Sequence, residues 1–139
     1  MSRRGLILVV LGAFGGPTAV AQVDLAVAVE AARSAWIRHD ARALFATSDT
    51  VRLRLPEVPA TQGLQPAHAV RLLVAFWAGA SEIQLDVRDV RQVADGHAYA
   101  ELERGFGVRG TGDRQVQSLY FGFRLEGDVW RLREVRITP

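Results

Sequence analysis

The sequence predicts an α+β domain in which N-terminal helices pack on one face of a curved antiparallel sheet. Two patterns of apolar residues predict this class. Apolar residues recur every three or four positions in residues 23–40 and 66–78, and they alternate with polar residues through most of residues 82–137. Long strands with one apolar face need a cover, which the preceding helices can supply. The 139 residues are enough for one such domain.

The first expected helix covers residues 23–40, with Asp24 placed as its N-cap. His39 and Asp40 interrupt the helical pattern, and Asp40 is placed to cap a short second helix over residues 41–47. The apolar stripe of the first helix and the buried residues of the second are Leu25, Val29, Ala32, Trp36, Leu44 and Phe45.

A strand and a third helix come next. Residues 51–55 alternate as a half-buried strand that Pro56 ends. Residues 56–66 contain three prolines and a glycine, so we expect a loop there. Pro66 suits the first turn of the third helix, which Gly79 ends. The apolar face of that helix comprises Val70, Leu73, Val74 and Trp77.

Four strands follow, in residues 82–93, 97–106, 114–126 and 129–137. Asp95-Gly96 and Glu126-Gly127-Asp128 are expected as the turns of two hairpins. In the strand over residues 97–106, small apolar residues alternate with polar ones. We expect the small apolar set to face the core and the polar set to face outward. The two sets are Ala98, Ala100 and Leu102, and His97, Tyr99, Glu101 and Glu103.

The two acids of that polar face would pair with arginines of neighbouring strands, such as Arg88 or Arg124. The opposite parity remains open at this point. It would bring Tyr99 and Glu101 into a cavity, where they could do chemistry.

Residues 105–113, GFGVRGTGD, contain the Gly-x-Gly-x-x-Gly spacing of a dinucleotide-binding fingerprint. That fingerprint works where a strand turns into a helix whose N-terminus meets the pyrophosphate. Here another strand follows, and no βαβ unit surrounds the segment. We therefore expect a flexible connection between antiparallel strands.

The first 21 residues are expected to be a secretory signal peptide. Arg3 and Arg4 open it, an apolar run covers residues 6–14, and Ala19-Val20-Ala21 forms a small-residue cleavage site before Gln22. The apolar run is too short to span a bilayer, which takes about 20 residues. The mature domain would then be residues 22–139, periplasmic or secreted, without a membrane span.

Charge and composition exclude several classes of activity. Arg3 and Arg4 supply the excess of 17 basic over 15 acidic residues, so the rest of the chain is balanced and gives no electrostatic reason to bind nucleic acid. The absence of cysteine removes disulfides, thiol nucleophiles and thiolate metal sites. All basic residues are arginine, which removes lysine Schiff bases and the P-loop lysine.

Nothing in the remaining motifs assigns a catalytic residue, a metal site or a cofactor. His39, His68 and His97 have no metal-ligand spacing, and surface positions would explain all three. Asp40 has a capping role, and Asp49 lies in a turn composition. No serine lies in a Gly-x-Ser-x-Gly elbow.

Aromatic residues at helix and strand period usually pack in a core, which is the first interpretation of those in this chain. As a second interpretation, they would line an apolar ligand pocket between helix and sheet. The pocket candidates are Trp36, Phe45, Trp77, Tyr99, Phe121 and Trp130.

Residues 36–45, WIRHDARALF, resemble the helix, aspartate-capped turn and short helix of the nuclear transport factor 2-like superfamily, which includes SnoaL-like polyketide cyclases and ketosteroid isomerases. Residues 53–77 and 120–137 are similar to a branch of small exported bacterial domains of unknown function. The resemblance implies a cone-shaped fold with a pocket that some members use catalytically. Isomerases of the superfamily use an aspartate base with a tyrosine and a second acid, and no such set matches here.

We therefore expect an exported, non-catalytic domain that binds a small apolar ligand or a protein partner, and that could form a homodimer through its sheet. The alternative is an isomerase- or cyclase-like enzyme with an acid in the cone, and a third possibility is an idle fold that serves only as a structural accessory. The binding domain and the enzyme differ in whether a carboxylate lies inside the cavity with a raised pKa. The carboxylates to inspect are Asp40, Asp49, Glu101 and Glu103.

Overall fold

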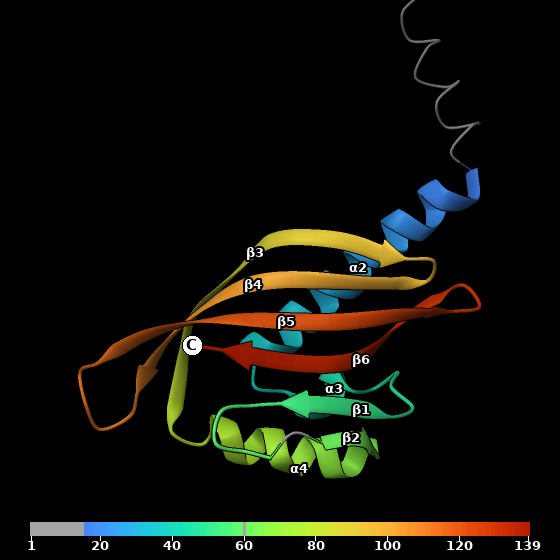
Figure 1. The fold of residues 1–139 in the computed structure, drawn as a ribbon. Helices are drawn as coiled ribbons and strands as arrows, with labels where there is room; N and C mark the ends of the chain where they lie inside the picture. The colour runs from blue at the N-terminus through green and yellow to red at the C-terminus, as the bar shows by residue number, and fades with distance from the viewer. Residues whose placement is uncertain (1–15, 60) are drawn as a thin grey trace, which may run out of the picture.

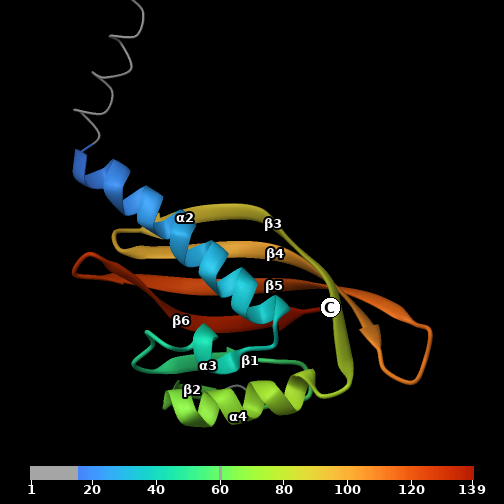
Figure 2. The ribbon, with the colours of Figure 1, turned by 180° about the vertical axis from the view of Figure 1, so that it is seen from behind.

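The computed structural model, which describes residues 16–59 and 61–139, is a curved six-stranded sheet with helices on one face (Figure 1, Figure 2). The strands lie in the order β2-β1-β6-β5-β4-β3. The β1–β6 pair is parallel and the other neighbours are antiparallel, so the sheet is mixed. The predicted α+β class is confirmed. The strands are β1 (Val51–Arg54), β2 (Thr61–Leu64), β3 (Ala80–Ala94), β4 (His97–Val108), β5 (Arg114–Glu126) and β6 (Val129–Thr138).

Three helices of the described residues cover the sheet. Figure 2 shows α2 (Gly16–Ile37) crossing the sheet, with α3 (Ala41–Leu44) and α4 (Pro66–Trp77) toward the β1 and β2 edge. The Asp40 side chain accepts a hydrogen bond from the Ala43 N–H at 3.0 Å, so the predicted cap of α3 is confirmed. No helix within the described residues is both long and apolar enough to cross a bilayer.

The start of α2 differs from the prediction. The helix begins at Gly16, so Asp24 lies inside it and is not its N-cap. Residues 1–15 of the predicted signal peptide, which covers residues 1–21, lie outside the described residues. The signal peptide therefore stays a prediction.

The segment predicted as a loop, residues 56–66, contains the short strand β2. This strand pairs antiparallel with β1, with Val51 opposite Leu64. Four residues that include a glycine of positive φ, Gly63, carry no alternation that would predict a strand.

The glycine-rich segment joins two antiparallel strands, as predicted. Gly105 and Gly107 lie within β4, and Gly110 has a φ of 80°, which favours glycine in the connection. The Val108 N–H donates to the Asp113 carbonyl at 3.1 Å and closes the turn, after which β5 begins. No helix follows the glycines, so the segment lacks the anion-binding helix N-terminus of a dinucleotide site.

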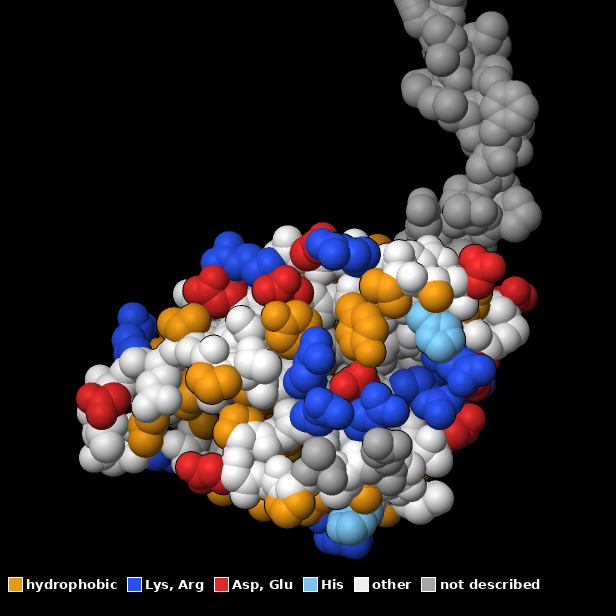
Figure 3. All heavy atoms as spheres, viewed as in Figure 1, with side chains coloured by type: hydrophobic (Ala, Val, Ile, Leu, Met, Phe, Trp, Pro, Cys, Tyr) orange, Lys and Arg blue, Asp and Glu red, His pale blue; other side chains and the backbone are white. Residues whose placement is uncertain are grey.

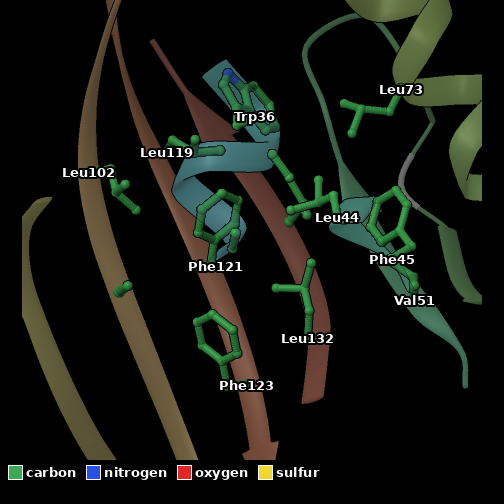
Figure 4. Packing of buried hydrophobic residues seen from close by; sticks show 14 of the residues in the cluster. Trp36, Leu44, Phe45, Val51, Leu73, Leu102, Leu119, Phe121, Phe123 and Leu132 are labelled. Atoms are coloured by element: carbon green, nitrogen blue, oxygen red, sulfur yellow. The ribbon is translucent and has the colours of Figure 1, made fainter. Parts of the chain in front are cut away.

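The core lies between the helices and the sheet (Figure 4). Ala98, Ala100 and Leu102 of β4 are buried against it, so the predicted parity of this strand is confirmed. The opposite face of the sheet is therefore free to carry polar side chains.

Candidate functional site

The six predicted pocket residues are divided between the two faces of the sheet. Five of them are at most 4% exposed and belong to the core cluster, where Trp36 and Trp77 meet edge to face with 5.1 Å between ring centroids. Tyr99 faces the other way, into a cleft on the outer face. The five core residues are Trp36, Phe45, Trp77, Phe121 and Trp130.

The four carboxylates considered for the enzyme alternative all lie outside the core. Asp40 caps α3, and Asp49 is exposed. Glu103 pairs with Arg88, as predicted, and Glu101 accepts a long hydrogen bond from the Tyr120 hydroxyl at 3.5 Å. None of the four therefore supplies the buried acid that the alternative requires.

The outer cleft is built on one row of residues across four strands. Tyr99 of β4 lies opposite Gly122 of β5, which lies opposite Glu134 of β6, which lies beside Arg52 of β1. The cleft has a volume of about 380 Å³. The complete lining is Thr50, Val51, Arg52, Gly63, His97, Tyr99, Gly122, Phe123, Arg124, Arg133 and Glu134.

Gly122 forms the floor of the cleft. A Cβ atom at this position would lie 2.9 Å from Cε1 of Tyr99 and 3.1 Å from Cβ of Glu134. Only a residue without a side chain allows the tyrosine ring and the glutamate to approach each other across β5.

Tyr99 and Glu134 form a hydrogen-bonded pair in this cleft. The Tyr99 hydroxyl donates to Oε1 of Glu134 at 2.8 Å, and Glu134 is 7% exposed. Burial raises the pKa of Tyr99, and the hydrogen bond to Glu134 and its negative charge raise it further. Tyr99 is therefore a neutral hydrogen-bond donor.

Arginines surround this pair. Figure 3 shows basic side chains gathered on the outer face around an acidic one. Arg133 is paired with Glu126 at 2.9 Å, and the guanidinium of Arg136 lies 4.4 Å from the ring centroid of Tyr120. Arg52 and Arg124 are exposed and form no ion pair with any carboxylate of the described residues. These two arginines outnumber Glu134, the carboxylate of the cleft that also forms no ion pair among the described residues, so the cleft has a net positive charge.

A second polar cluster lies in the core and was missed by the sequence analysis. Glu82 accepts hydrogen bonds from Nε and Nη2 of Arg104 at 2.8 and 2.5 Å, and from Nε1 of Trp36 at 3.0 Å. Nε2 of His39 lies 3.0 Å from Oε2 of Glu82. The side chains of Glu82 and Arg104 are 2% and 1% exposed.

Burial by itself would raise the pKa of Glu82. The hydrogen bonds from Arg104 and His39, the charge of Arg104 and the hydrogen bond from Trp36 outweigh burial and lower the pKa below its ordinary value of 4.5. Glu82 is therefore ionised and saturated with donors, which suits a structural ion pair and not a general acid or base with a raised pKa.

A bulge explains why Glu82 was missed. Strict alternation along residues 82–93 would place Ile83 on the core face and Glu82 outside. The register of β3 shifts between Glu82 and Gln84, however, so Glu82 turns inward and Ile83 is 43% exposed. One signal could have found the pair, because Arg104 shares the parity of the buried Leu102. A charged residue at a core position needs a counter-charge.

The surface position predicted for His39 is only partly correct. Its side chain is 25% exposed, and its ring stacks on Trp77 with 4.5 Å between centroids. His68 and His97 are exposed, as expected. Within the described part of the chain, no three histidine or acidic side chains are grouped as metal ligands.

A second groove of about 470 Å³ lies over the junction of α2 and α3. Its charged groups include Arg38 and Asp40, which form an ion pair at 3.8 Å. This pair leaves Arg42 as the one arginine of the groove without an ion pair among the described residues, whereas the outer cleft holds two such arginines, Arg52 and Arg124. The outer cleft is therefore the stronger candidate site.

No family model and no curated protein matches the sequence. Solved structures do match in fold. A ketosteroid isomerase-like protein from Erwinia carotovora atroseptica is 18% identical, with 84% of this chain and 96% of that chain covered and a TM-score of 0.68. A protein of the NTF2-like family from Streptomyces avermitilis, named as a candidate dehydratase, is 20% identical over 84% and 93% of the two chains, with a TM-score of 0.62.

A third structure, from Catenulispora acidiphila, has a ketosteroid isomerase-like fold and was solved in complex with trimethylamine. It is 14% identical over 81% of this chain and 84% of that chain, with a TM-score of 0.64. The chain thus has the nuclear transport factor 2-like fold, as its sequence resemblance implied. At these sequence identities the structural similarity establishes the fold alone, and any activity has to be inferred from the residues of the site.

Proposed function

We propose that the protein is an exported, non-catalytic binding domain whose outer cleft holds a small molecule with an anionic group. The observation that carries the proposal is the pair of arginines without ion-pair partners, Arg52 and Arg124, beside the hollow over Gly122. A guanidinium presents planar donors that match a carboxylate or phosphate with two hydrogen bonds.

The size of the cleft supports a small ligand. Its volume of about 380 Å³ lies within the usual range of ligand sites, about 300 to 1,000 Å³. The sequence favours an apolar ligand, because its aromatic residues recur at positions that could line a pocket. Five of those six residues fill the core, and the cleft is lined by arginines, so the proposal becomes an anionic ligand. The trimethylamine held by the Catenulispora protein supports small-molecule binding by this fold.

Calorimetric titration of the purified protein with propanoate, at low salt, tests the proposal. A hydrogen bond to a charged group contributes about 1.5 to 3 kcal/mol, so Arg52→Ala and Arg124→Ala are each expected to weaken binding about tenfold or more. Arg71→Ala, an exposed arginine of α4, is the matched control and should leave the affinity unchanged. Absence of binding, or equal losses in all three variants, would overturn the proposal.

Export has its own test. When the full chain is produced in a bacterium, the mass of the exported protein should correspond to an N-terminus at Gln22. Recovery of only the unprocessed chain inside the cell would contradict export.

The enzyme alternative is carried by one observation, the Tyr99–Glu134 pair. A carboxylate and a protonated tyrosine within one cleft are the groups that acid–base catalysis uses. The pair lies on the outer face, away from the space between helices and sheet. Conversion of a bound carbonyl compound that Glu134→Gln abolishes, while binding persists, would favour this alternative.

A further inference from the structure

The position of Glu134 carries information about the ligand beyond its anionic group. This carboxylate lines the cleft and is 7% exposed, so any bound anion would lie near a second, poorly solvated negative charge. Two negative charges within the same cleft repel each other. A cleft that served anions alone would be better without this carboxylate.

Glu134 is also only partly satisfied. Its Oε1 accepts the Tyr99 hydroxyl at 2.8 Å, and Oε2 accepts no hydrogen bond from any described residue. Arg52 lies beside it in the sheet, yet the two side chains form no ion pair. Tyr99 therefore holds one carboxylate oxygen in place and leaves the other to a donor that enters the cleft.

We infer that the ligand is a small zwitterion, whose ammonium group binds Glu134 and whose carboxylate binds Arg52 and Arg124. This inference rests on the proposed function and names the class of ligand for the same cleft. A short amino acid has both groups, and each would meet an opposite charge.

The spacing of the strands sets the length of such a ligand. Arg52 is one strand away from Glu134, and neighbouring strands are about 5 Å apart. Arg124 lies two residues beyond Gly122 on β5 and pairs with Arg131, across the register shift between Gly122 and Phe123, so its backbone lies diagonally to that of Glu134 at a separation of at least about 7 to 8 Å. An ammonium and a carboxylate joined by one to three carbon atoms fit between these anchors.

Three probes with the same carbon skeleton test the inference: β-alanine, propanoate and propylamine, each titrated into the purified protein by calorimetry at neutral pH. β-Alanine should bind about tenfold more tightly than propanoate or better, because it gains a charge-assisted hydrogen bond at Glu134. Propylamine should bind more weakly than β-alanine, since it lacks a group for the arginines.

Glu134→Gln provides the second arm. Glutamine keeps an acceptor oxygen for the Tyr99 hydroxyl, so the variant should fold, which circular dichroism checks. The affinity of the variant for β-alanine should fall to within about threefold of its affinity for propanoate. Glu101→Gln, on the same outer face but outside the cleft, is the matched control and should keep the preference for β-alanine.

The outcomes separate the two proposals. If propanoate binds in an Arg52-dependent manner and β-alanine binds no better, the zwitterion is wrong and the anion site stands. If neither propanoate nor β-alanine binds, the proposed function fails, and this inference fails with it. A preference for β-alanine that survives Glu134→Gln would also overturn the inference, because the ammonium would then bind elsewhere.

Discussion

Removal of the Glu82 carboxylate would leave a guanidinium in the core without a counter-charge. In Glu82→Ala, Arg104, whose side chain is 1% exposed, would lose both hydrogen bonds to the carboxylate and keep only the bond from Nη1 to Gln117 at 2.8 Å. Loss of one partner of a buried pair costs about 3 to 5 kcal/mol. Since a domain is stabilised by about 5 to 15 kcal/mol, the variant should be severely destabilised.

Urea unfolding, followed by circular dichroism and tryptophan fluorescence, measures this loss. Glu103→Ala removes the exposed partner of Arg88 and is the matched control, with little expected change. Glu82→Leu combined with Arg104→Met should recover much of the stability, because replacing both charges with apolar groups removes the uncompensated one. A loss below about 1 kcal/mol in Glu82→Ala, or a double variant no more stable than the single one, would refute the buried pair.

Three further predictions concern pH and the cleft. Folding lowers the pKa of Glu82, so the contribution of this carboxylate to stability is present above its ordinary pKa of 4.5 and is lost as the pH falls through its pKa in the folded protein. The free energy of unfolding, measured from pH 6 to pH 2, should therefore fall less steeply in Glu82→Gln than in the unchanged protein. Folding raises the pKa of Tyr99, so the contribution of the Tyr99 hydroxyl to stability is present below its ordinary pKa of 10.0 and is lost as the pH rises through its pKa in the folded protein. Absorbance at 295 nm should therefore show one tyrosine that ionises at unusually high pH, and Tyr99→Phe should remove this signal. Gly122→Ala should cost about 1 to 3 kcal/mol in urea unfolding and abolish propanoate binding, since its methyl group meets the Tyr99 ring. Gly79→Ala, with no atom within 4 Å of the added carbon, should leave propanoate binding unchanged.

The parts of the fold that the sequence predicted correctly depend on local patterns. Alternation along β4 placed Ala98 inside and Tyr99 outside, and the Asp95-Gly96 turn joined β3 to β4. The cap at Asp40 follows from the chemistry of its own side chain. Each of these features is decided by residues within a few positions of one another.

The candidate site depends on pairings between distant parts of the chain. The cleft exists because β1 pairs in parallel with β6, which brings Arg52 beside Glu134, and no local pattern specifies that register. Glu82 was missed for a related reason, since a bulge at Ile83 reversed the faces predicted for the start of β3. The sequence correctly predicted that five aromatic residues lie between the helices and the sheet, but these residues pack as core and do not line a pocket.

The most direct test of the outer cleft as the ligand site is a propanoate titration followed through the backbone amide resonances of the ¹⁵N-labelled protein. The amides of Arg52, Tyr99, Gly122 and Arg124 should shift together and saturate, while those around the α2–α3 groove, such as Arg42 and Val74, should stay in place. Saturating shifts confined to the α2–α3 groove, or no saturating shifts at all, would contradict a ligand site on the outer face of the sheet.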